Sequence, residues 1–335
     1  MNHNPLPIHH SELLKLSPSM RFKGDTTIES WQDAARAKLT ELLGYDKLIA
    51  AKDDCFKIEE QNEYDGYTDY RIAFQSEEGY FVLCNLWIPK NKDGKIPLVI
   101  CLQGHSRGRH ISLGRPIYPG DEADISGGDR DFAVQIVKEG YCALAIEQRG
   151  FGECGGTPEG PACLVPSMTA LLYGRTTIGE RVFDISRAID VILKNFDVVD
   201  AENIACMGNS GGGTATIYAA AMEKRIKVAM PSCALCTYKD SIGAMHHCSC
   251  NYVPGIANYL DMGDLCGLIA PRGLVVVSGA KDRIFPRDGV SESIDVAKEY
   301  FKETEAEDKI AWIEGPEGHR FYAALSWPTF HKFFD

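Results

Sequence analysis

The chain has 335 residues, of which 44% are hydrophobic, and a formal net charge of −12. This length and composition are typical of a globular protein with one large core, and the acidic balance disfavours a nucleic-acid partner because phosphates are bound by an excess of cations. No apolar run is long enough to span a membrane and the first residues lack a leader pattern, so we expect a cytoplasmic protein with no membrane contact.

The first 65 residues are predicted to form an N-terminal helical extension. A short helical segment covers residues 11–16, and a longer amphipathic helix covers residues 27–48, with Gly44 as a candidate helix stop. A second subunit could dock on such an extension, so a homo-oligomer is left open.

Residues 66–335 are predicted to form one large domain of the α/β class. Residues 70–75 and 80–89 resemble an antiparallel pair, and strands alternate with helices after them. This alternation indicates a mostly parallel central sheet with helices on both faces. Further strands are predicted at residues 96–103, 141–147, 204–207, 226–231, 273–279 and 309–314, and helices at 129–139, 177–195, 289–303 and 319–334.

The most informative motif is Gly208-Asn209-Ser210-Gly211-Gly212, which lies between a predicted strand and an alanine-rich helix. A tight strand–turn–helix of the form Gly-x-Ser-x-Gly exposes its serine at the apex, and the free N–H groups of the following helix can stabilise an oxyanion. We therefore interpret Ser210 as a nucleophile. The alternative is a glycine-rich turn without chemistry.

A serine nucleophile needs a general base, and the base is best oriented by a carboxylate. His319 follows the strand predicted at 309–314, and Asp282 follows the strand at 273–279, which gives the chain order Ser, Asp, His. Asp288 is the rival carboxylate, although the start of a helix is its simpler role.

Further site residues are expected in the loops above the sheet. The backbone N–H groups of His105 and Gly211 are the candidate donors to the oxyanion. Arg107 and Arg109 are candidates for contacts with a polar group of the substrate, and Tyr252 is a candidate for the wall of the pocket. A solvated loop is the simpler interpretation of the two arginines, and a surface excursion that only packs over the sheet is the alternative for the segment of Tyr252.

Several cysteines lie near two histidines in the segment after residue 232. Zinc could bind there, but the spacing matches no standard zinc motif. Packed, reduced thiols are therefore favoured, and neither a metal nor a cofactor is predicted. The cysteines concerned are Cys233, Cys236, Cys248 and Cys250.

Four segments in the expected order resemble the α/β-hydrolase superfamily: Leu102–His105, Gly208–Gly212, Ser278–Asp282 and Gly318-His319. Within it, the chain is similar to the acetyl xylan esterase and dienelactone-hydrolase-like branch. The resemblance implies cleavage of small esters, often acetyl groups on sugars. Members of that branch usually have glutamine after the serine, whereas this chain has Gly211, so deacetylase specificity does not follow directly.

The sequence as a whole thus predicts a serine carboxylic ester hydrolase that acts through a Ser-His-Asp triad and an acyl-enzyme. Its partner is expected to be a small-molecule or saccharide ester. A peptidase or amidase of the same fold is the alternative, followed by a non-catalytic binding module.

Overall fold

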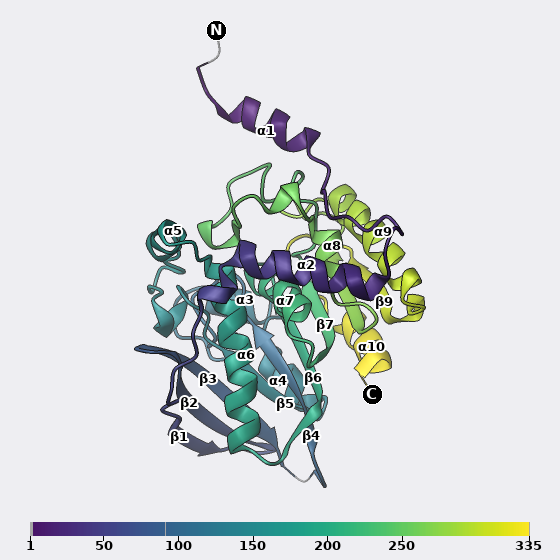
Figure 1. Ribbon diagram of the computed structural model, residues 1–335. Coiled ribbons are helices and arrows are strands. Elements are labelled where there is room, and N and C mark those ends of the chain that lie inside the picture. The colour runs from purple at the N-terminus through teal and green to yellow at the C-terminus, as the bar shows by residue number, and fades with distance from the viewer. Residues whose placement is uncertain (1–2, 91, 335) are drawn as a thin grey trace.

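The computed structural model describes residues 3–90 and 92–334. Within them the strands form one nine-stranded sheet in the order β1-β2-β3-β5-β4-β6-β7-β8-β9 (Figure 1). Strands β1, β2, β3 and β5 pair antiparallel, and all pairs from β5 through β4 to β9 are parallel. The strands are β1 Lys57–Glu63, β2 Tyr67–Glu77, β3 Tyr80–Pro89, β4 Ile96–Leu102, β5 Cys142–Ile146, β6 Val199–Asn209, β7 Ile226–Ser232, β8 Gly273–Gly279 and β9 Ile310–Gly315.

Helices cover both faces of the sheet. Helices α2, α6, α7, α8 and α9 contribute to the apolar layer on one face, and α4 and α10 pack on the other. In the described ranges, no helix combines the length and apolar character needed to cross a bilayer. The helices are α1 Leu6–Lys15, α2 Ile28–Leu43, α3 Asp121–Ile125, α4 Phe132–Lys138, α5 Leu164–Leu172, α6 Thr177–Asn195, α7 Gly211–Met222, α8 Met262–Gly267, α9 Arg287–Glu303 and α10 Ala323–Phe334.

The central strand β4 shows how the sheet is buried on both sides. Leu98, Ile100 and Leu102 belong to the larger apolar cluster, whereas Val99 and Cys101 belong to the smaller one. Alternate side chains of a strand point to opposite faces, so a strand covered by helices on both sides is apolar throughout. The mostly parallel sheet predicted from the sequence is therefore confirmed.

The structure differs from the prediction in several segments. Residues 57–63, placed by the sequence in the helical extension, form the edge strand β1, and all seven are exposed. Helices α3, α5 and α8 were not predicted. The last helix begins at Ala323 instead of residue 319, because the preceding residues form the turn after β9. Gly44 does end α2, with a φ of 64° that suits glycine.

Candidate active site

Ser210 occupies a tight turn between β6 and α7. Its φ of 55° and ψ of −123° are rarely adopted by residues with a side chain. Two backbone hydrogen bonds of 2.8 Å hold this conformation: the Ser210 N–H donates to the Ser232 carbonyl oxygen, and the Thr214 N–H donates to the Ser210 carbonyl oxygen. The strained turn presents the hydroxyl at the carboxyl edge of the sheet, as expected for a nucleophile elbow.

The glycines of the turn are required by the close approach of neighbouring backbone. A Cβ at Gly212 would come within 2.6 Å of the Gln103 carbonyl oxygen, at the end of β4, and one at Gly208 would come within 2.6 Å of Gly212 backbone atoms. Any side chain at these positions would push α7 away from the sheet. The glycine-rich sequence thus fixes the position of Ser210.

Asp282 and His319 form a hydrogen-bonded pair in the loops after β8 and β9. The His319 Nδ1 and Asp282 Oδ2 atoms are 2.8 Å apart, and the Asp282 side chain is fully buried. Burial opposes its ionisation, but the His319 hydrogen bond and the N–H groups of Ile284 and Phe285 hold the pKa of Asp282 below its usual value. The carboxylate therefore accepts a hydrogen bond from the Nδ1–H group of His319, which leaves Nε2 available as a base.

The pair lies at the same sheet edge as Ser210. Ser232, whose carbonyl oxygen binds the Ser210 N–H, is followed by Cys233, and the Sγ atom of Cys233 is within 4.8 Å of ligand atoms of both Asp282 and His319. No hydrogen bond joins the Ser210 hydroxyl to the His319 ring anywhere in residues 3–90 and 92–334. Such contacts are often long without substrate and shorten when it binds.

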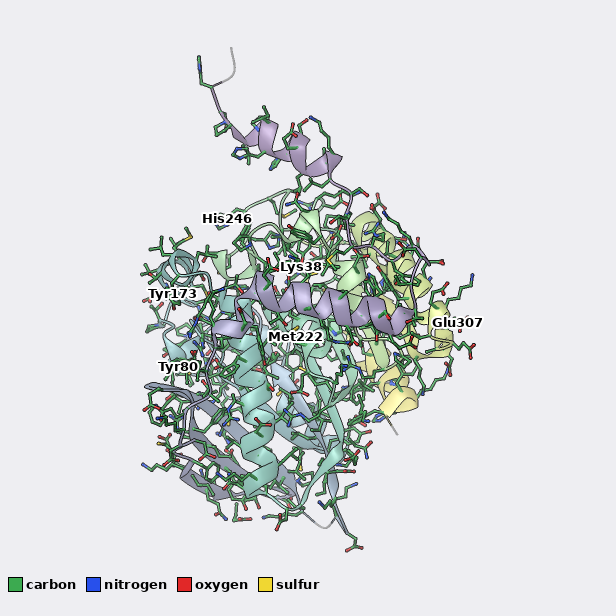
Figure 2. All side chains as sticks on the ribbon, viewed as in Figure 1. Lys38, Tyr80, Tyr173, Met222, His246 and Glu307 are labelled. Carbon is green, nitrogen blue, oxygen red and sulfur yellow. The ribbon has the colours of Figure 1, made fainter. Side chains whose placement is uncertain are left out.

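Ser210 lines a cavity of about 780 Å³, and the wall of this cavity is mostly apolar. Helix α5 and the segment around residues 246–252 supply most of the wall. Tyr252 is part of it, as predicted, and its hydroxyl donates to the Ile242 carbonyl oxygen at 3.0 Å. Figure 2 labels His246, another lining residue, and Tyr173, which directly follows α5. The lining residues are His105, Pro161, Cys163, Leu164, Met168, Leu171, Ser210, His246, His247, Cys248, Ser249, Asn251, Tyr252 and Ile284.

The two residues that carry the expected oxyanion donors, His105 and Gly211, are in contact. The ring of His105 packs against Gly211, where a Cβ would be 2.6 Å from the His105 Cε1 atom. Within the described part of the chain, neither backbone N–H has an acceptor. Both N–H groups are therefore free to bind an oxygen atom of a ligand, and this is the state that an oxyanion site needs.

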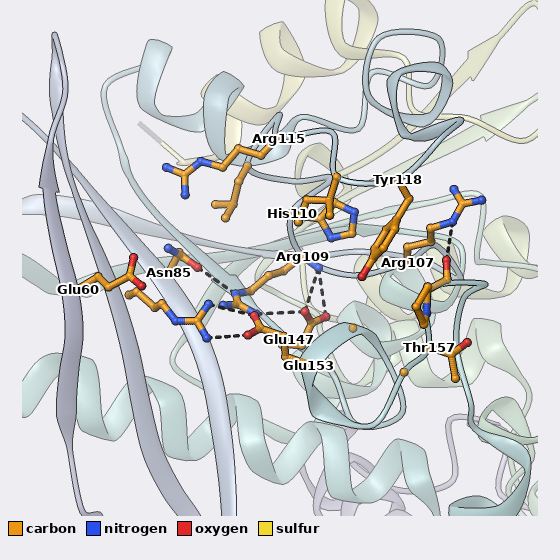
Figure 3. Close-up of a pocket in the computed structure, with 16 residues that line it drawn as sticks. Glu60, Asn85, Arg107, Arg109, His110, Arg115, Tyr118, Glu147, Glu153 and Thr157 are labelled. Atoms are coloured by element: carbon orange, nitrogen blue, oxygen red, sulfur yellow. Dashed lines mark hydrogen bonds and ion pairs between the residues drawn. The ribbon is translucent and has the colours of Figure 1, made fainter.

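Arg107 and Arg109 do not line the cavity of Ser210. They line a separate pocket of about 400 Å³ (Figure 3), where both are already paired. Arg109 is buried, and its Nη1 atom lies 3.1 Å from Glu147 Oε2, while the Nη1 atom of Arg107 lies 3.0 Å from Asp121 Oδ1. Because these carboxylates neutralise both side chains, the structure does not support the expected contact with substrate.

The cysteines that the sequence grouped together lie in two places. Cys233 Sγ donates to the Arg320 carbonyl oxygen at 3.2 Å, and Cys236 Sγ lies 3.8 Å from the Pro286 carbonyl oxygen. Cys248 and Cys250 lie elsewhere, with His105 and Cys163. Sequence spacing could not reveal this second grouping, because its members come from three distant segments.

Comparisons with known proteins agree with this architecture. The profile of the family described as Acetyl xylan esterase (AXE1) matches residues 51–264. YtaP of Bacillus subtilis (strain 168), provisionally assigned as a hydrolase, is 30% identical over 209 residues. That match covers 60% of this chain and 66% of YtaP, which is just under two thirds of the relative's length.

Solved structures share the fold at low identity. A provisionally assigned acetyl xylan esterase of Bacteroides fragilis NCTC 9343 superposes with a TM-score of 0.78 at 17% identity, over 94% of this chain and 83% of its own. A glucuronoyl esterase from Solibacter usitatus gives a TM-score of 0.67 at 16% identity, over 96% and 98%. The chain has the α/β-hydrolase fold, and the family match shows that it belongs to the acetyl xylan esterase family.

Proposed function

We propose that this protein is a serine carboxylic ester hydrolase for small or carbohydrate-linked esters of the acetyl type. The observation that carries the proposal is the strained turn that presents Ser210 to a cavity. The Asp282–His319 pair lies at the same edge of the sheet. Membership of the acetyl xylan esterase family supports the same reaction.

In the proposed reaction, Ser210 Oγ attacks the ester carbonyl and His319 Nε2 takes the hydroxyl proton. The free N–H groups of His105 and Gly211 bind the oxyanion of the tetrahedral intermediate. His319 then gives its proton to the leaving alcohol, and a water activated by the same ring cleaves the acyl-enzyme. Asp282 holds the ring and stabilises its charged form throughout.

The shape of the site fits a small substrate. A cavity of about 780 Å³ is within the range of small-molecule sites, and its apolar wall suits an acyl group. An amide hydrolase of the same fold would need the same catalytic groups, so the site's geometry alone favours neither reaction. Family membership is what favours the ester.

Hydrolysis of p-nitrophenyl acetate by the wild type and by Ser210→Ala tests the proposal. We expect kcat to fall by about 10³-fold or more in the variant, because no nucleophile remains. Ser126→Ala, which removes an exposed hydroxyl outside the cavity, is the matched control. Equal activity in wild type and Ser210→Ala would refute the proposal, and faster cleavage of a matched anilide would favour an amidase.

A further inference from the structure

Three distant segments of the chain bring together, beside the cavity, four side chains of the types that bind metal ions. They are His105, Cys163, Cys248 and Cys250, and one ligand atom of each lies within 4.8 Å of those of the others. The His105 Nε2 atom is 3.2 Å from Cys250 Sγ, and the Sγ atoms of Cys248 and Cys250 are 3.4 Å apart. Three sulfur atoms and one imidazole nitrogen are a common ligand set of structural zinc.

A buried cation lies against the same sulfur atoms. Arg181 is 1% exposed, and its Nη1 and Nη2 atoms donate to Cys250 Sγ at 3.3 Å and to Cys163 Sγ at 3.4 Å. Its remaining hydrogen bonds go to the Arg149 carbonyl oxygen, and the Phe151 ring packs on the guanidinium. Over residues 3–90 and 92–334, no carboxylate forms an ion pair with it.

The guanidinium of Arg181 favours negative charge on the sulfur atoms that it contacts. A guanidinium remains charged inside a protein, and a buried charge needs a partner of opposite sign. The sulfur atoms next to Arg181 are the groups that can supply negative charge. Thiolate is also the form of cysteine that binds metal ions.

We propose that His105, Cys163, Cys248 and Cys250 bind one Zn²⁺ ion in a tetrahedral site. Zn–S bonds of about 2.3 Å place sulfur ligands about 3.8 Å apart, and the observed cluster is compact enough to reach that spacing by small side-chain adjustments. Zn²⁺ with three thiolates and a neutral imidazole carries a net charge of −1, which Arg181 balances. Binding forms four coordinate bonds and releases the protons of any thiols that still carry them.

The proposed ion has a structural role. All four positions are taken by protein, as in closed zinc sites, so no position is left for a substrate. The ligands join the loop after β4, the residue before α5, and the loop at residues 248–250. These are the segments that wall the cavity, and the ring of His105 also packs against Gly211. Zinc would thus fix the cavity wall and the loop carrying the His105 N–H.

Metal content tests this proposal without reference to any hydrolase activity. Full-length protein is produced with added Zn²⁺, dialysed under reducing conditions and analysed by inductively coupled plasma mass spectrometry. We expect about one zinc per wild-type chain, and at least a tenfold lower content in Cys163→Ser and in Cys248→Ser. Cys236→Ser, which alters a residue outside the cluster that is as buried as Cys163, should keep its zinc.

Two measurements on the wild type avoid any dependence on how the variants fold. Replacement of zinc by Co²⁺ should give the intense visible bands of a tetrahedral, sulfur-rich site. Removal of the metal with 1,10-phenanthroline should lower the melting temperature, and added Zn²⁺ should restore it.

Several results would overturn the proposal. One is reduced wild-type protein that takes up no zinc or Co²⁺. Another is a disulfide between two of the cluster cysteines in protein that binds no metal, because the cluster would then be a redox pair. Equal loss of zinc in Cys163→Ser and Cys236→Ser, or an unchanged melting temperature after the metal is removed, would also count against it.

Discussion

The buried carboxylate of Asp282 binds the ring of His319 through Oδ2, while its Oδ1 atom accepts the N–H groups of two loop residues. Asp282→Asn would keep the shape but present an amide to Nδ1, which favours the wrong tautomer of the ring. We expect kcat for p-nitrophenyl acetate to fall by roughly 10³- to 10⁴-fold with little change in folding. Asp288→Asn is the matched control, because Asp288 is exposed in the first turn of α9. Similar losses in both variants would contradict the assignment.

Glu153 provides a pH-dependent contribution to stability. Hydrogen bonds from Arg71 lower the pKa of Glu153 to about 2. The charge of Arg109 lowers it further, whereas partial burial of the carboxyl acts in the opposite direction. A carboxyl whose pKa is lower when folded stabilises the protein above its unfolded pKa of about 4.5, and that contribution is lost as the pH falls towards 2. Because the side chain is 50% exposed, solvent screening reduces the effect to about 1 kcal/mol.

Urea denaturation at two pH values checks this sign. Glu153→Gln should be less stable than wild type by about 1 kcal/mol at pH 7, and the difference should shrink by more than half at about pH 3. Glu159→Gln, at an exposed position outside any ion pair of the described residues, should behave like the wild type at both. A difference that grows on acidification would show that the sign is wrong.

At the scale of elements, the approach of α7 to β4 depends on Gly212. A methyl group there would collide with the Gln103 carbonyl oxygen, which is backbone and cannot rotate away. Overpacking of this kind costs about 1–3 kcal/mol, and more when backbone must move. We therefore expect Gly212→Ala to lower the free energy of unfolding by about 3 kcal/mol or more in urea titrations. Gly318→Ala should cost far less, because a Cβ there meets nothing nearer than 3.6 Å.

Elements with a strong apolar pattern could be predicted from the sequence, and those without one could not. Helix α6 covers Thr177–Asn195, as its amphipathic repeat indicates. Strand β1 was missed because all seven residues are exposed, so the period of two that reveals a half-buried strand is absent. Helix α5 was missed for a related reason: Leu164 and Leu172 are 65% and 89% exposed, and of its apolar residues only the small Ala170 is buried, so they mark no apolar stripe.

The candidate site shows the same limit. Ser210, Asp282 and His319 could be singled out because each lies in the turn or loop that follows a strand, and parallel strands end at one edge. The cavity wall could not, because α5 and residues 246–252 meet only through tertiary packing. The pairing of Arg109 with Glu147 likewise depends on two loops that are 38 residues apart.

At the scale of the whole molecule, the N-terminal segment takes part in the main core. Trp31, Leu39 and Leu43 of α2 are buried in the same apolar cluster as β4, α6 and α7. Arg36 donates to the carbonyl oxygens of Ala221 and Leu268, which lie at the ends of α7 and α8. Helix α1, by contrast, buries no residue and extends away from the body (Figure 1). The two helices should therefore differ sharply in their effect on stability.

Leucine-to-alanine substitutions in the two helices test this difference. Leu39 in α2 is 0% exposed and Leu14 in α1 is 64% exposed. Leu39→Ala should lower the free energy of unfolding by about 2–5 kcal/mol, whereas Leu14→Ala should change it by less than about 0.5 kcal/mol. If α2 unfolds with the sheet, circular dichroism and tryptophan fluorescence should report one coincident transition that Leu39→Ala moves as a whole. A separate early transition in that variant would instead mean that α2 is an independently unfolding unit.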